Sequence, residues 1–503
     1  MRLKRAIGFV LCFGLFVLVR SSELSVDRKT YAPVIPRVWN DQEISTLHVP
    51  LANAVATPEH VSSEYYYQIP VRPIYKSYPV YAPGKEPIGY QEWLKEQTPE
   101  LAFDPSSLKT EDDWIKAGEI VFDAPVFYDV LVRFKDVQNP NWFEQAGVRP
   151  AKDGTVPWFR YVIRERGKVE LGTLSCAMCH VRLMRDQSVI KGAQGNFPFE
   201  RAGELVAKHT FTLDRMRTFE RRFFGVPWLE PDPLLPLENM SLEQVAAMHG
   251  KIPPGVIARH GTSPLYPPQV SDLIGVKERK YLDHTGLQLH RSIVDMMRYA
   301  AFNQGGDDLT NYGGLVPAAK DLRTLPEPET QKRYSDEQLY ALALYIYSLT
   351  PPPNPNKFDR QAAHGKRVFE REGCSGCHTP PLYTNNKLTP VDGFRVPSEH
   401  RQKYDVLWSS VGTDPRLALN TRRGTGYYKV PSLLGVWYRG PFEHNGSVAT
   451  LEDWFDLRRL RNDYVPTGFR GFGTTTRAVK GHEFGLELSP EDRRNLIAFL
   501  KTL

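Results

Sequence analysis

Two five-residue motifs constrain this chain more than any other feature, CAMCH at residues 176–180 and CSGCH at residues 374–378. They contain four of the five cysteines, and the fifth, Cys12, lies in the apolar N-terminal segment. Two cysteines separated by two residues and followed by histidine form the attachment site of a c-type haem, in which thioethers hold the porphyrin. The predicted attachment cysteines are Cys176, Cys179, Cys374 and Cys377.

The histidine that ends each motif, His180 in the first and His378 in the second, is the predicted proximal ligand of the iron. The cysteines could instead form two redox dithiols or a single four-cysteine zinc site. Neither alternative requires a histidine directly after both cysteine pairs, whereas haem attachment does. The chain is therefore expected to carry two covalently bound c-type haems.

The chain begins MRLKRAIGFVLCFGLFVLVRSS, a basic start followed by an apolar run. This run is shorter than the roughly 20 apolar residues that a membrane span needs. We interpret residues 1–24 as a signal peptide or a short N-terminal anchor, and expect a periplasmic or secreted protein. No other segment reads as a membrane span. The formal charge of +6 is modest and no basic stripe is present, so nucleic acid is not an expected partner.

Three pairs of segments indicate an internal repeat around the motifs. A helix with the pattern G-x-x-V-F is expected before each motif, in DDWIKAGEIVFDAP (112–125) and RQAAHGKRVFEREG (360–373). A serine-capped helix is expected at the end of each repeat, in SDEQLYALALYIYSL (335–349) and SPEDRRNLIAFLKTL (489–503). Between these helices, VSDLIGVKERKYLDHTG aligns without gaps with VPSLLGVWYRGPFEHNG, and seven of the 17 positions are identical. The repeat predicts two homologous domains.

These features predict a mainly α-helical fold with two tandem cytochrome c-type haem domains. The first domain is expected at residues 108–350, with long loop insertions before and after its motif. The second is expected at residues 357–503, after the stiff proline-rich linker PPPNPN at residues 351–356. Residues 25–107 are rich in proline and tyrosine and show no sustained hydrophobic period, which predicts an irregular extension that wraps the first domain.

The segment VPSLLGVWYRGPFEHNGSVATLEDWF, together with the two motifs in tandem domains, resembles the bacterial di-haem cytochrome c peroxidase superfamily. That group includes the methylamine-utilisation di-haem enzyme and the rubber oxygenases. The resemblance covers about residues 108–503, and the ending VKGHEFGLELSPEDRRNLIAFLKTL is most similar to the rubber-oxygenase branch. It implies that the first haem is reactive and the second passes electrons. It also implies a calcium ion between the domains, for which the acidic stretch GGDDLTN is the only sign.

The loop before the closing helix supplies the distal ligand in cytochrome c domains, and here it contains His482. No methionine follows Met297, so the second domain has no thioether for its iron. The peroxidases place methionine in this loop, whereas the rubber oxygenases resemble this chain in having histidine. We therefore predict that His482 binds the second iron, which lowers its reduction potential relative to a thioether. The alternative is a surface loop histidine; His444 is expected to support the haem or the domain contact.

The surroundings of the first haem lack two groups that the peroxidases carry. The stretch KGAQGNFPFERAG contains no histidine that could plug the resting site, and no carboxylate follows DHTG to protonate a leaving oxygen. Phe302 lies near that second place. A distal phenylalanine resembles the rubber-oxygenase pocket, so Phe302 is the predicted catalytic-pocket residue. The alternative for Phe302 is ordinary core packing on an amphipathic helix.

Three functions are consistent with these residues. The first is an oxidoreductase that activates O2 at the first haem, with electron transfer through the second and an apolar organic substrate. The second is a peroxidase that reduces H2O2 with electrons from a small redox protein. The third is a non-catalytic electron carrier, which would require two strong ligands on both irons.

Overall fold

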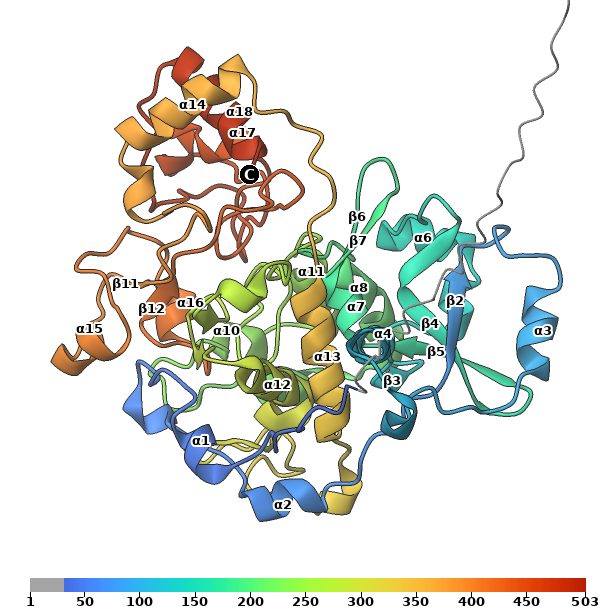
Figure 1. The fold of residues 1–503 in the computed structure, drawn as a ribbon. Coiled ribbons are helices and arrows are strands. Elements are labelled where there is room, and N and C mark those ends of the chain that lie inside the picture. Colours follow the sequence, from blue (N-terminus) through green and yellow to red (C-terminus); the bar gives the residue numbers. More distant parts are fainter. Residues whose placement is uncertain (1–30) are drawn as a thin grey trace, which may run out of the picture.

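The computed structural model describes residues 31–503 of the chain (Figure 1). The predicted leader at residues 1–24 and the first residues of the predicted extension lie outside the described residues. Within residues 31–503, no helix has the length and apolar character needed to cross a membrane. In Figure 1 the second domain, coloured orange to red, lies at one end of the molecule. A single extended linker segment connects it to the larger first domain.

Two packed helices frame the first domain. Helix α4 (Glu111–Asp123) begins with a capping box on Thr110, and α13 (Asp336–Ser348) begins with one on Ser335. The two helices cross at Gly118, where an added Cβ would lie only 1.9 Å from the carbonyl oxygen of Ala341. Only glycine therefore permits this close backbone approach.

The second domain repeats this arrangement with α14 (Arg360–Arg371) and α18 (Pro490–Lys501). A Cβ added at Gly365 would lie 1.8 Å from the carbonyl oxygen of Asn495. The two crossings agree in a second contact. A Cβ added at Gly365 would lie 2.8 Å from the Cβ of Phe499, and one added at Gly118 would lie 2.8 Å from the Cβ of Tyr345. The mainly helical fold with two repeated helix pairs is confirmed.

A four-stranded antiparallel sheet, which the repeat did not predict, leads into the first motif. Its order is β2 (Ser77–Tyr81), β4 (Thr155–Glu165), β5 (Lys168–Thr173) and β3 (Phe127–Tyr128). Two residues after β5, Ser175 caps the short helix α7 (Cys176–His180), which carries the first motif. Trp158 of β4 is buried and donates from Nε1 to the Val181 carbonyl at 2.9 Å. The sheet thus anchors the first motif on both sides.

The insertion after the first motif includes three longer helices, α8 (Phe199–Thr210), α9 (Leu213–Phe224) and α11 (Leu242–Gly250). They meet at the buried His249, whose Nδ1 lies 2.6 Å from a Glu200 oxygen and whose Nε2 lies 2.8 Å from a Glu220 oxygen. Burial alone would lower the pKa of His249, but the two carboxylates raise it to about 10. A charged imidazolium therefore joins the three helices.

The N-terminal extension lies along the first domain and has little regular structure. It contains α1 (Asp41–Ser45), α2 (Ser63–Gln68), α3 (Tyr90–Glu96) and β1 (Pro58–Glu59), which pairs with β10 (Asn311–Tyr312). Its backbone also pairs with the first domain: the Val49 amide donates to the Leu287 carbonyl at 2.7 Å, and the Leu289 amide donates to the Leu47 carbonyl at 2.9 Å. These bonds form an isolated antiparallel bridge between His48 and Gln288 of the domain.

The two domains meet at the end of the first repeated segment, residues 270–286. The Lys429 amide, at the end of β12 (Tyr427–Lys429), donates to the His284 carbonyl at 3.0 Å. The Thr425 hydroxyl donates to the Thr285 carbonyl at 2.6 Å. The interface therefore brings residues 284–285 of the first domain beside residues 425–429 of the second.

Candidate functional site

The second cysteine motif follows α14 through Gly373, whose φ of 72° is left-handed, and begins a short 3-10 turn at Cys374. The Nδ1 atom of the buried His378 donates to the Tyr383 carbonyl at 3.1 Å. This bond leaves Nε2 without a proton and fixes the ring orientation, as the second nitrogen of a metal-bound histidine usually does.

His482 faces His378 across a cavity. The two ring centroids lie 6.1 Å apart, with an angle of 56° between the planes. An imidazole nitrogen binds a metal at about 2 Å, so one ion between two facing rings requires a centroid separation of about 6 Å. Nδ1 of His482 is buried without a hydrogen-bond partner, and burial lowers the pKa of His482 to about 4. The neutral ring pair fits a metal ion between them.

Arg459 positions the loop that carries His482, and the sequence analysis did not identify it. Its side chain is 1% exposed and donates to the carbonyls of Gly481 at 3.0 Å and His482 at 2.9 Å. The His482 backbone has a φ of 47° and its amide donates to the Val411 carbonyl at 2.6 Å. A buried guanidinium satisfied by carbonyls thus holds an unfavourable backbone conformation.

The cavity between the rings has a volume of about 280 Å³, and the second cysteine pair also lines it. Its lining is mostly apolar, including Phe369, Val436, Leu451, Trp454, Phe455 and Leu500. These walls therefore suit an apolar group tethered to the cysteines, as a haem requires.

Three cations line the end of this cavity at the domain interface: Arg279 of the first domain, and Lys429 and Arg439 of the second. Asp272 is the only lining carboxylate within ion-pair distance of any of them, at 3.8 Å from Arg439. The other lining carboxylate, Glu443, contacts the neighbouring His444 instead.

Burial first, and then the charges of Arg279 and Arg439, lower the pKa of Lys429 to about 7. Buried like charges repel each other unless an anion lies among them. The surplus of positive charge therefore fits an anionic group such as the propionates of a haem.

The first motif has the same local geometry. Nδ1 of His180 donates to the Ser271 carbonyl at 3.0 Å, and burial is the main cause that lowers the pKa of His180 to about 4. In the repeat alignment Ser271 corresponds to Pro431, and hydrogen bonding to the Pro431 backbone is one of the causes that raise the pKa of His378. Equivalent segments of the two domains therefore orient the two motif histidines.

The opposite side of the first site is different. Within residues 31–503 no imidazole ring faces His180 at the distance at which His482 faces His378. Helix α12 (Ile293–Ala301) runs into a π-helical turn, Phe302–Gly306, and Nε2 of Gln304 lies 3.8 Å from Sγ of Cys176. Phe302 thus lies on a turn that contacts the first cysteine pair.

Phe302 is 3% exposed and packs among rings of the N-terminal extension. Its centroid lies 4.9 Å from that of Trp39, 5.0 Å from that of His48 and 4.8 Å from that of His60. The predicted apolar residue therefore has two imidazoles in contact with it. The sequence analysis missed both histidines, because nothing in a segment without periodicity indicates which distant residue it covers.

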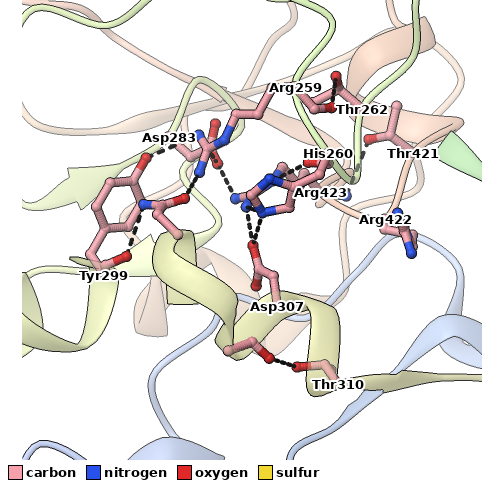
Figure 2. Close-up of polar contacts among 12 residues, drawn as sticks. Arg259, His260, Thr262, Asp283, Tyr299, Asp307, Thr310, Thr421, Arg422 and Arg423 are labelled. Carbon is pink, nitrogen blue, oxygen red and sulfur yellow. Dashed lines mark hydrogen bonds and ion pairs between the residues drawn. The ribbon is translucent and has the colours of Figure 1, made fainter. Parts of the chain in front are cut away.

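A buried ion cluster lies next to this turn (Figure 2). Arg423 of the second domain pairs with Asp283 at 2.6 Å and with Asp307, while Arg259 pairs with Asp283 at 3.2 Å. Nε2 of His260 also contacts Asp307, at 3.0 Å. Although burial would raise the pKa of Asp307, Arg423 and His260 hold it far below its usual range. Two guanidinium groups balance two carboxylates, so this cluster is neutral without a further ion.

The acidic stretch proposed for calcium includes Asp307, which is already paired with Arg423. Among residues 31–503 there is no group of three or more acidic, cysteine or histidine side chains that could hold a metal ion. The predicted calcium ion therefore remains a prediction that no side-chain cluster of the described residues supports.

No protein-family model matches the chain. It is 24% identical to the cytochrome c551 peroxidase of Pseudomonas aeruginosa over 202 residues, 38% of this chain and 50% of that protein. It is also 24% identical to a cytochrome c peroxidase of Denitromonas iodatirespirans over 220 residues, 37% of this chain and 54% of that protein. The chain spans about half the length of these curated relatives, and it is distantly homologous to di-haem cytochrome c peroxidases.

Two solved structures show partial likeness to the fold. The hydrazine synthase of Kuenenia stuttgartiensis is 15% identical, with a TM-score of 0.31, over 60% of this chain and 91% of that chain. A MauG-like protein associated with microbial copper homeostasis is 16% identical, with a TM-score of 0.29, over 47% of this chain and 73% of that chain.

Proposed function

We propose that this chain is an exported di-haem c-type oxidoreductase in which an oxygen species reacts at the first haem and electrons pass through the second. The observation that carries this proposal is the asymmetry of the two sites. His378 has a second imidazole 6.1 Å away, whereas His180 has none among residues 31–503. An iron with two imidazole ligands exchanges electrons, and an iron with one keeps a position for substrate.

The chain's own residues have distinct tasks in this proposal. The four motif cysteines would form the thioethers, His180 and His378 would each bind one iron, and His482 would be the second protein ligand of the second iron. Haem iron supplies one-electron transfer and binds oxygen species. The Ser271 and Tyr383 carbonyls orient the proximal rings, while Arg279, Lys429 and Arg439 hold the propionates of the second haem. Covalent haem c is consistent with a periplasmic or secreted location.

The finer proposal is O2 activation beside an apolar organic substrate, as in the rubber-oxygenase branch. The buried Phe302, on a turn that contacts the first cysteine pair, supports an apolar wall for such a substrate. Dioxygen could then attack a neighbouring apolar carbon without a carboxylic acid nearby.

The second candidate is reduction of H2O2 with electrons from a small redox protein. The observation that favours it is the distant homology to two cytochrome c peroxidases. Both candidates share one electron-transfer haem and one open haem, so they differ only in what reacts at the first iron.

Electron paramagnetic resonance of the purified ferric holoprotein tests this proposal. We expect one low-spin signal from an iron with two imidazoles and one high-spin signal from an iron with one. Two low-spin signals that resist added ligands would leave only an electron carrier. Oxygen uptake with an apolar substrate, compared with peroxide turnover by a reduced small cytochrome, then separates the two reactions.

A further inference from the structure

The imidazoles of His48 and His60, both half-buried side chains of the N-terminal extension, lie against the buried Phe302 of the first domain. Nδ1 of His48 lies 3.3 Å from Nε2 of His60, and Nδ1 of His60 lies 3.0 Å from the Thr310 hydroxyl. The Thr310 hydroxyl in turn donates to the Gly306 carbonyl at 2.9 Å. The result is a continuous hydrogen-bonded chain from the extension to the π-helical turn.

The direction of these bonds follows from the last one. A carbonyl oxygen can only accept, so the single hydroxyl proton of Thr310 is used on Gly306 and the hydroxyl must accept from His60. The proton of neutral His60 therefore lies on Nδ1, and its Nε2 is an acceptor. Neutral His48 must then donate from Nδ1, which leaves the lone pair of its Nε2 free.

The surroundings keep both rings neutral near pH 7. Burial lowers the pKa of His48 to about 4 and that of His60 to about 3. The charged groups around His48 are Asp307 and Asp283, which favour a proton on it, and Arg423, which opposes one. The backbone on either side of His48 is fixed by the hydrogen bonds of Val49 and Leu47, and the ring itself is held by its bond to His60.

We propose that Nε2 of His48 is the proton acceptor of the first haem site, with His60 and Thr310 as positioning residues that set its tautomer. This inference rests on the proposed function, because it requires an open first haem. The first domain has no carboxylate after DHTG that could transfer a proton. In this proposal a histidine of the extension performs that transfer instead.

In peroxide reduction, His48 would take a proton from one oxygen of hydrogen peroxide. It would return this proton to the other oxygen, which leaves as water when the O–O bond breaks. The remaining oxygen atom becomes the second water with two electrons from a small redox protein and two protons from solvent. General acid–base groups of this kind contribute typically about 10²–10⁴-fold to rate.

Cyanide binding to the ferric holoprotein tests the proposal without turnover. Hydrogen cyanide must lose its proton to bind iron as the anion, so a proton acceptor speeds association. We expect His48→Gln, which keeps a donor for His60 but is no base, to slow cyanide association about 10²-fold or more. In this variant the rate should rise with pH as free cyanide anion appears, whereas the unmodified protein should show a flat profile.

Thr310 provides a matched pair of variants. Thr310→Val removes the acceptor that fixes the tautomer of His60 and should slow association, while Thr310→Ser keeps the hydroxyl and should restore it. An unchanged rate and pH profile in a His48→Gln protein that retains both haem spectra would overturn the inference and leave the proposed function standing. A protein that carries both haems but binds no cyanide would overturn both, since the first iron would have no open position.

Discussion

The two motif sites are built from the same repeat, but distant residues equip them differently. In both, a glycine at the helix crossing admits the closing helix, and the motif histidine donates to a backbone carbonyl. At the second site a histidine of the domain's own loop faces the motif histidine. The three cations that line its cavity outnumber the carboxylates paired with them. At the first site the ions are balanced, and the additional imidazoles come from the extension. The comparison shows that the two repeats share the frame around their cysteine motifs, whereas loops and the extension make the two sites different.

The largest expected effect is the loss of one haem. Replacing Cys374 and Cys377 with alanine removes both thioethers of the second site only. We expect the haem content, measured by mass spectrometry and by haem retained after acid-acetone extraction, to fall from two to one. The high-spin signal of the first haem should persist. Loss of both haems, or of neither, would contradict two independent attachment sites.

The insertion after the first motif should contribute stability through His249. Leucine at this position leaves two buried carboxylates without their cation, which costs about 3–5 kcal/mol of unfolding free energy in denaturant titrations. Because the folded pKa is raised to about 10, the imidazolium contribution is complete below pH 6.5 and is lost as the pH rises through 10. The exposed His209 of α8 is the control, and His209→Leu should change little; an equal loss there would contradict this role.

His482→Met should affect the second haem alone. A thioether favours ferrous iron, so the reduction potential of that haem should rise by on the order of 0.1 V, within the span of about 0.8 V available through axial ligands. Redox titration followed in the visible spectrum measures the shift. An unchanged potential and spectrum would exclude His482 as the ligand, and His444 would be tested next.

The smallest expected effect concerns the cation surplus. Arg279→Gln removes one positive charge from the cavity of the second site. Ferric iron is then stabilised relative to ferrous iron, so the reduction potential of the second haem should fall. The neighbouring Lys280 also crosses the domain interface, to Asp405, but does not line the cavity. Lys280→Gln is therefore the matched control and should leave the potential unchanged. Equal shifts in both variants would show a general interface effect.

Local sequence patterns predicted the helices that frame each domain. The G-x-x-V-F pattern and the serine caps locate α4, α13, α14 and α18, since helix periodicity and capping depend on residues within one or two turns. The four-stranded sheet before the first motif was missed, because its strands at residues 77–81 and 155–165 are far apart in the chain. The contact between Phe302 and His48 was missed for the same reason, because more than 250 residues separate the two in the chain.

The sequence alone determined the two motifs, the duplication and the place of His482 before the closing helix. The spacing of two residues between the cysteines and the histidine next to them are local features of the chain. They can therefore be identified without tertiary information. Only the tertiary structure decided what faces each motif histidine. His48 pairs with Phe302, and Arg279 joins Lys429, through packing of segments that no local pattern connects. The physical reason is that burial, charge balance and hydrogen-bond direction arise only when distant segments exclude water together.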